Sequence, residues 1–247
     1  DVCSSDLASD HGWCNHGTIA TDYYVTNLFV ELGKISSWSG GPSYRDRNAM
    51  ERHINYSRDN WADSTEFFLW AGHGYGVDKA GVKQGAFHFF NKNSTTDFHG
   101  LGLHVQDSCL ATWDEIRWGN NNLRWASAYT CNFLKTGGTN ANLEKLLKMF
   151  QGIHVITGFA SKMYIKKNEG TTYGTYLRQG YAFKDAWVNA AKLNQPKIND
   201  AGYNINAAWA YHNNYQNDTM WASTTRAPKY SSSTKGDFGR KYCLVNN

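Results

Sequence analysis

The sequence lacks three features that would assign a protein to a class at once. No apolar run approaches the roughly 18 residues of a membrane span, so we expect no membrane segment. Lysine and arginine are spread along 247 residues without a block beyond Lys166-Lys167, and the formal net charge is only +4. This distribution is too weak for a nucleic-acid surface. No linker and no internal repeat divides the chain, which favours a single domain over residues 1–247.

Charged residues are also scarce, at 19%, whereas aromatic residues reach 15% and include ten tryptophans and fifteen tyrosines. The mean hydropathy is nevertheless −0.61, because the rest of the sequence is rich in asparagine, serine and threonine. This balance is typical of a folded protein with a polar surface and excludes a disordered chain. A chain of this length can bury a sizeable core, which we expect over about residues 18–220. A cysteine-containing segment precedes that core, and a Ser/Thr/Lys-rich tail follows it.

Five cysteines suggest an oxidising compartment in which four are paired and one thiol is kept. If Cys131 is left out of the pairing, Cys3, Cys14, Cys109 and Cys243 can pair in three ways. The sequence starts at Asp1 without Met and without the hydrophobic segment of a signal peptide, as expected of a mature or trimmed chain. We therefore expect a secreted or extracellular protein.

The stretch Glu66 to Gly76 combines a buried strand with a glycine-rich turn. Its apolar run, Phe67 to Trp70, is too short for a helix and rich in strand-forming residues. The run leads into Ala71-Gly72-His73-Gly74, where glycines allow a sharp turn and a close approach of the backbone to a bound group. His73 then lies at the carboxyl end of a buried strand, where open α/β sheets bind ligands. Histidine also suits general base chemistry near neutral pH.

A second predicted strand, Leu123 to Thr130, ends directly at Cys131. If the two strands are neighbours in a parallel sheet, thiol and imidazole meet as a nucleophile and its base. The alternation of further elements favours an α/β sheet with helices on its faces. Apolar periodicity predicts helices over 18–35, 141–150 and 181–193 and a buried strand over 152–159. Weaker patterns predict strands over 85–90 and near 207–211, and helices around 47–54 and over 112–118.

These motifs resemble the caspase-type (clan CD) cysteine peptidases, and more closely bacterial caspase-like domains of uncharacterised function. The similarity covers about Asp59 to Leu193. Besides His73-Gly74 and the strand that ends at Cys131, it consists of short motifs: Trp118-Gly119, Leu123-Arg124-Trp125, Phe150-Gln151-Gly152-Ile153-His154, Gly158-Phe159, Gly180 and Ala186-Trp187.

This resemblance implies a three-layer α/β/α sandwich around a mainly parallel sheet. It also implies a cysteine endopeptidase that acts on a protein or peptide substrate. By the resemblance, Cys131 supplies the attacking sulfur and His73 gives a proton to the leaving amine. The backbone N–H groups of Gly74 and Cys131 form the oxyanion hole. The family needs no third, orienting carboxylate.

Cys109 is the rival nucleophile. Asp107-Ser108-Cys109 has the pattern of an acid, a small residue and a cysteine that is common in these peptidases, whereas Tyr129-Thr130-Cys131 lacks the acid. We favour Cys131 because residues 101–106 form a poorer buried strand. The spacing of His88, His99, His104 and Cys109 fits no zinc pattern, so we expect surface or loop histidines and no metal site. Calcium sites built from carbonyl oxygens leave little trace in sequence, so calcium is neither predicted nor excluded, and no other cofactor is expected.

A function of a different class is a non-catalytic extracellular module on the same fold, which binds glycan or peptide through exposed aromatic rings. The candidates for such a surface are Trp13, Trp38, Trp61, Trp118, Trp209 and Trp221, although core packing explains most of the ten tryptophans. His154 lies inside an apolar strand, where we predict a hydrogen-bonded core histidine.

Overall fold

The computed structural model describes residues 21–41, 54, 62–79, 82–88, 110–138, 140–222 and 225–245. Its helices are α1 (Asp22–Leu32), α2 (Asn140–Leu147), α3 (Lys167–Arg178) and α4 (Phe183–Asn194). Its strands are β1 (Phe67–Ala71), β2 (Gly74–Lys79), β3 (Val82–His88), β4 (Leu110–Thr112), β5 (Trp125–Tyr129), β6 (Val155–Phe159), β7 (Asn206–His212) and β8 (Phe238–Leu244). In these parts of the chain, no helix is both long enough and apolar enough to cross a bilayer.

The central sheet has five strands in the order β1-β5-β6-β7-β8. Strands β1, β5 and β6 are parallel, as expected, whereas β7 and β8 are antiparallel to their neighbours. Two helices, α3 and α4, lie between β6 and β7 in the chain, so the chain returns to the sheet in the opposite direction. The protein therefore belongs to the α/β class with a mixed sheet.

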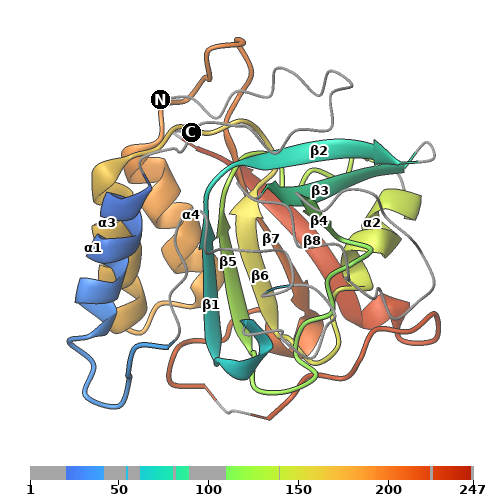
Figure 1. Cartoon of the computed structure of the whole chain (residues 1–247), viewed down its shortest axis with the longest axis horizontal. Coiled ribbons are helices and arrows are strands. Elements are labelled where there is room, and N and C mark those ends of the chain that lie inside the picture. The colour runs from blue at the N-terminus through green and yellow to red at the C-terminus, as the bar shows by residue number, and fades with distance from the viewer. Residues whose placement is uncertain are drawn as a thin grey trace, which may run out of the picture.

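Burial explains why β5 and β6 are continuous apolar or small-residue runs. All five residues of each strand are buried, because layers cover both faces of the sheet. On one face, α1, α3 and α4 pack over Phe67, Trp125, Tyr129 and Phe159. On the other face lie α2 and the antiparallel sheet β2-β3-β4 (Figure 1).

Helix α3 was not predicted, because its two internal glycines weaken the helical pattern. The structure shows why they are there. A Cβ on Gly170 would lie 2.1 Å from the carbonyl oxygen of Tyr24, and one on Gly174 would lie 2.7 Å from Glu31 Cβ. The glycines thus allow α3 to pack closely against α1, which carries Tyr24 towards the sheet.

Several element boundaries differ from the predictions. The helix predicted over 112–118 is wrong: β4 ends at Thr112 and a turn follows, in which Glu115 accepts hydrogen bonds from the Thr112 N–H at 2.7 Å and hydroxyl at 2.8 Å. Helix α2 ends at Leu147 because Phe150 forms a bridge with Trp118. Part of the predicted tail forms β8, the edge strand of the central sheet. The helix predicted around 47–54 lies outside the described residues, except for Ile54.

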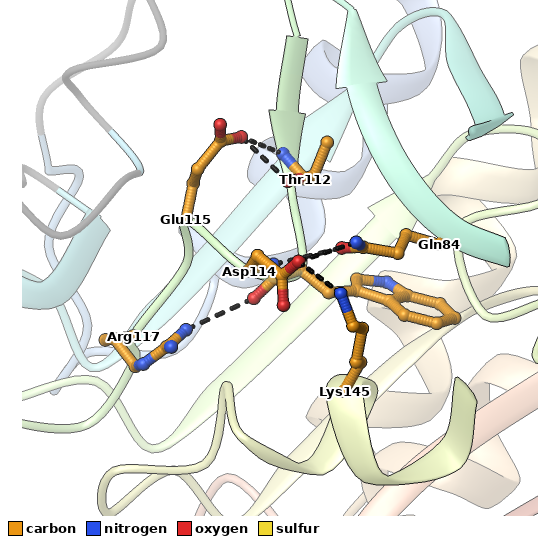
Figure 2. A network of polar contacts seen from close by, with 7 residues as sticks. Gln84, Thr112, Asp114, Glu115, Arg117 and Lys145 are labelled. Atoms are coloured by element: carbon orange, nitrogen blue, oxygen red, sulfur yellow. Dashed lines mark hydrogen bonds and ion pairs between the residues drawn. The ribbon is translucent and has the colours of Figure 1, made fainter. Parts of the chain in front are cut away.

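A polar network ties β3 and α2 to the turn after β4 (Figure 2). Asp114 accepts hydrogen bonds from Gln84 and from Lys145, each at 2.6 Å, and its N–H donates to the Gln84 side-chain oxygen at 3.2 Å. Burial opposes ionisation of Asp114, but the hydrogen bonds from Lys145 and Gln84 outweigh it and lower the pKa of this carboxyl group. The network anchors β3 and therefore the hairpin that follows His73.

Candidate active site

His73 and Cys131 lie at the same edge of the central sheet. Strands β1 and β5 are parallel neighbours, and their last paired residues are Ala71 and Tyr129. Each candidate residue follows its strand by the same two positions. Since adjacent strands are about 4.8 Å apart, the register brings the two backbones side by side at the carboxyl ends of the strands. This arrangement agrees with the edge position expected from the sequence.

Gly74 is the point of closest approach between the two segments. A Cβ at this position would lie 2.1 Å from the Thr130 hydroxyl oxygen and 2.6 Å from the Cys131 carbonyl oxygen. Only glycine fits without displacing the backbone at Cys131. The backbones at the two expected oxyanion donors, Gly74 and Cys131, are therefore in contact.

The hairpin β2-β3 returns the chain to His73 and places His88 beside it. The His88 N–H donates to the His73 carbonyl oxygen at 3.1 Å, and the two imidazole rings are 6.4 Å apart. His88 is the last residue of β3, within the strand predicted over 85–90, and its side chain is half-buried. His99, His104 and the rival Cys109 lie outside the described residues. Within the described ones, no cluster of His, Cys, Asp or Glu could hold a metal ion.

Cys131 is buried, with 1% of its surface exposed, although an attacking sulfur must be reached by its substrate. The Met163 N–H donates to its sulfur at 3.3 Å, and the sulfur lies 3.8 Å from the Met163 carbonyl oxygen. The next residue, Asn132, has a φ of 59°, a left-handed conformation that asparagine tolerates better than most residues. Strained backbone of this kind is often found at functional sites. Apart from the asparagine itself, nothing in the sequence predicted this left-handed conformation.

Neither Cys131 nor Cys243 belongs to a disulfide in the structure. The pairing expected for Cys243 is thus absent, and its sulfur lies 3.4 Å from the Leu244 carbonyl oxygen. Cys3, Cys14 and Cys109 lie outside the described residues.

A buried carboxyl group, Glu169, lies in a network with Tyr129, which precedes Cys131 by two residues. Its Oε2 atom accepts hydrogen bonds from Gln195 at 2.5 Å and from the Tyr129 hydroxyl at 3.1 Å. Desolvation by burial outweighs these hydrogen bonds and raises the pKa of Glu169 to about 8. The ring of Tyr24 stacks on Tyr129, with centroids 3.6 Å apart. Burial also raises the pKa of Tyr24, so its hydroxyl stays neutral.

His154 lies at the amino end of β6, at the opposite edge of the sheet from Cys131. Its Nδ1 is 2.5 Å from the Asp218 carboxylate and its Nε2 is 2.6 Å from the Thr225 carbonyl oxygen. The ring is fully buried and stacks on Tyr215 at 4.0 Å. The prediction of a hydrogen-bonded core histidine is confirmed.

The tryptophans expected at a binding surface occupy different environments. Trp118 is fully buried, which contradicts its proposed exposure, because its ring packs between Phe68 and Phe87 and its N–H donates to the Ile54 carbonyl. Trp38 and Trp209 are partly buried, whereas Trp221 is 56% exposed. Trp13 and Trp61 lie outside the described residues.

Fold and site together define a mixed α/β protein that carries a histidine and a cysteine at the carboxyl ends of neighbouring parallel strands. The chain belongs to the family DUF6345, described as a domain of unknown function, whose family model matches residues 27–239. The match includes His73, Cys131 and strands β1 to β7. No curated protein matches the chain.

Proposed function

We propose that this protein is a secreted cysteine endopeptidase with a caspase-like three-layer α/β/α fold. The observation that carries the proposal is the register of β1 and β5, which gives His73 and Cys131 equal positions beyond neighbouring strand ends. Close contact at Gly74 adds support, because the absence of a side chain lets the segment that carries His73 pack directly against Thr130 and Cys131. The five cysteines are the basis for proposing secretion; since neither Cys131 nor Cys243 belongs to a disulfide, Cys3, Cys14 and Cys109 allow one disulfide in place of the two expected.

The chemistry divides into acylation and hydrolysis. The Cys131 thiolate attacks the carbonyl carbon of the peptide bond, and the N–H groups of Gly74 and Cys131 hold the resulting oxyanion. The carbon–nitrogen bond breaks as the protonated His73 gives its proton to the leaving amine. Water then attacks the thioester and gives a proton to His73. The acid product leaves, and the sulfur is released as thiolate.

Burial of Cys131 favours a second candidate, the non-catalytic module that binds glycan or peptide on the same fold. A peptidase needs a thiol that its substrate can reach, whereas a binding module can keep a cysteine in its core. An exposed aromatic patch is available for the binding function: Trp221 lies beside Gly180, next to Tyr181, which is 41% exposed.

Cleavage of a denatured proteome, followed by mass spectrometry of the new peptide termini, separates these functions. The wild-type protein should create new termini, and Cys131→Ala and His73→Ala should each abolish them, because members of a dyad act as a unit. Cys131→Ala should also lower the free energy of unfolding by about 1 kcal/mol, since the side chain is packed in the core.

Cys109→Ala is the matched control and should keep cutting. If Cys109→Ala is folded but inactive while Cys131→Ala still cuts, Cys109 is the nucleophile instead. If the wild-type protein cuts nothing and Cys131 resists iodoacetamide, the binding function replaces the peptidase.

A further inference from the structure

The backbone N–H and C=O groups of Met163, which belong to successive peptide groups, are positioned to interact with the two protonation states of Cys131. The N–H donates to the sulfur at 3.3 Å, and the carbonyl oxygen lies 3.8 Å from the same sulfur. A thiol can donate weakly to the carbonyl, whereas a thiolate accepts from the N–H. Hydrogen bonds to a charged partner are about twice as strong as neutral ones, so the N–H contact favours the thiolate.

The segment that carries this N–H has little freedom to move. The side-chain amide of Gln195 pairs with both backbone groups of Tyr164: its oxygen accepts the Tyr164 N–H at 2.9 Å, and its nitrogen donates to the Tyr164 carbonyl oxygen at 2.6 Å. The Tyr129 hydroxyl accepts the Lys166 N–H at 2.8 Å. Gln195 is 3% exposed and is held in turn by Glu169.

We propose that Gln195 is a positioning residue for Cys131: it fixes the Tyr164 peptide so that the adjacent Met163 N–H stabilises the Cys131 thiolate. The inference rests on the proposed function, in which Cys131 attacks as a thiolate. Gln195 follows the last residue of α4 and lies over sixty residues beyond the cysteine in the chain. Its side chain acts on Cys131 only through the backbone atoms of Tyr164 and Met163.

Other titratable groups belong to the elements around the thiol. Among the described residues they include His73 after β1, Tyr24 on α1, Tyr129 on β5, Lys162 and Tyr164 on either side of Met163, and Lys166, Glu169 and Tyr173 at or on α3. Among them, Glu169 changes charge near pH 8, within the range in which thiols titrate. The pH dependence of Cys131 must therefore also be measured in Glu169→Gln, where that step is absent.

The test is the rate of alkylation of Cys131 by iodoacetamide in the full chain, between about pH 5 and pH 10, where thiols titrate. Mass spectrometry of the Cys131 peptide gives the rate, and the peptide that contains Cys243 serves as an internal control. Gln195→Met keeps the shape of the side chain and removes both hydrogen bonds to Tyr164. Asn194→Ala is the matched control, because Asn194 is the neighbouring residue and bonds only to Thr172 and Ala190 in the described structure.

Gln195→Met should raise the midpoint of the Cys131 profile by about one pH unit, a tenfold loss of thiolate at lower pH. Asn194→Ala and the Cys243 profile should not change. A change in the plateau rate alone reports access to the thiol rather than its ionisation. Tyr129→Phe releases the Lys166 N–H while keeping the ring, and it should raise the midpoint as well. If Gln195→Met does not fold, the midpoint of Tyr129→Phe tests the proposal in its place.

The possible failures are distinguishable. If wild-type Cys131 has a lower midpoint than Cys243 and folded Gln195→Met or Tyr129→Phe leaves it unchanged, the positioning role is wrong while the nucleophile stands. If wild-type Cys131 is inert, or titrates like Cys243, the proposed function fails and the positioning role fails with it.

Discussion

The burial of Glu169 predicts a specific dependence of stability on pH. Only 2% of its surface is exposed, and desolvation raises its pKa from 4.5 to about 8. Below pH 4.5 the carboxyl is protonated in both the folded and the unfolded chain, so it makes no difference to stability. Between 4.5 and about 8 the unfolded chain releases this proton and the folded chain keeps it. Stability is therefore lost as the pH rises through this window.

The magnitude follows from the width of the window. At about 1.4 kcal/mol for each pH unit, the interval from 4.5 to about 8 corresponds to about 5 kcal/mol. Other carboxyl groups also change stability with pH, so the relevant quantity is the difference between the wild-type protein and Glu169→Gln. Glutamine resembles the protonated acid in shape and can still accept the hydrogen bonds from Tyr129 and Gln195.

Urea unfolding at a series of pH values gives the free energy of unfolding for each variant. The wild-type value should fall relative to that of Glu169→Gln by about 5 kcal/mol across the window and stay level outside it. Asp200→Asn is the control, because Asp200 is exposed and should follow the wild type. A difference between wild type and Glu169→Gln that stays constant with pH would show that Glu169 is ionised in the folded protein, and the reasoning from burial would be refuted.

Two further predictions concern the two edges of the sheet. Gly74→Ala should lower the free energy of unfolding in urea by about 1–3 kcal/mol, because the new Cβ would displace Thr130 and the Cys131 carbonyl; an unchanged free energy of unfolding would contradict the close approach. His154→Phe should lower the free energy of unfolding in urea by about 3–5 kcal/mol, because the largely buried Asp218 loses the closer of its two side-chain partners among the described residues and keeps the Trp125 N–H at 3.3 Å. If His154→Phe is as stable as the wild type, His154 is not the anchor of this edge.

The central part of the fold could be predicted because its information is local. Strands β1, β5 and β6 are short apolar runs. His73-Gly74 follows β1, Cys131 follows β5, and a turn follows β6. Alternation with helices accounts for the parallel pair β5 and β6, which α2 separates, whereas β2, β3 and β4 lie between β1 and β5 in the chain. The shared edge of His73 and Cys131 was expected from the position of each residue after a buried strand. The helix α4 and strand β7 were predicted near their observed bounds for the same reason.

Other features depend on contacts between distant segments. Gly170 and Gly174 weaken the helical pattern of α3 in the sequence, and only the packing of α3 against α1 explains why they are glycines. Strand β8 has Lys241 and Tyr242 on its exposed part, so its alternation is too weak to distinguish it from a polar tail. The burial of Cys131 and its contact with Met163 join residues 32 positions apart. No local sequence pattern predicted that Gln195 holds the segment around Tyr164.

The two ends of the sheet differ in their polar contacts. At the amino end of β6, His154 has oxygen partners on both ring nitrogens and stacks on Tyr215, an arrangement that leaves nothing to exchange with a ligand. At the carboxyl edge, His73 is partly exposed, Asn132 adopts a left-handed conformation, and Glu169 has a pKa of about 8. Strained backbone and displaced pKa values are costly to stability and concentrate at functional sites. Under the proposed function, substitutions of His73 and Cys131 at this edge should therefore change activity more than stability.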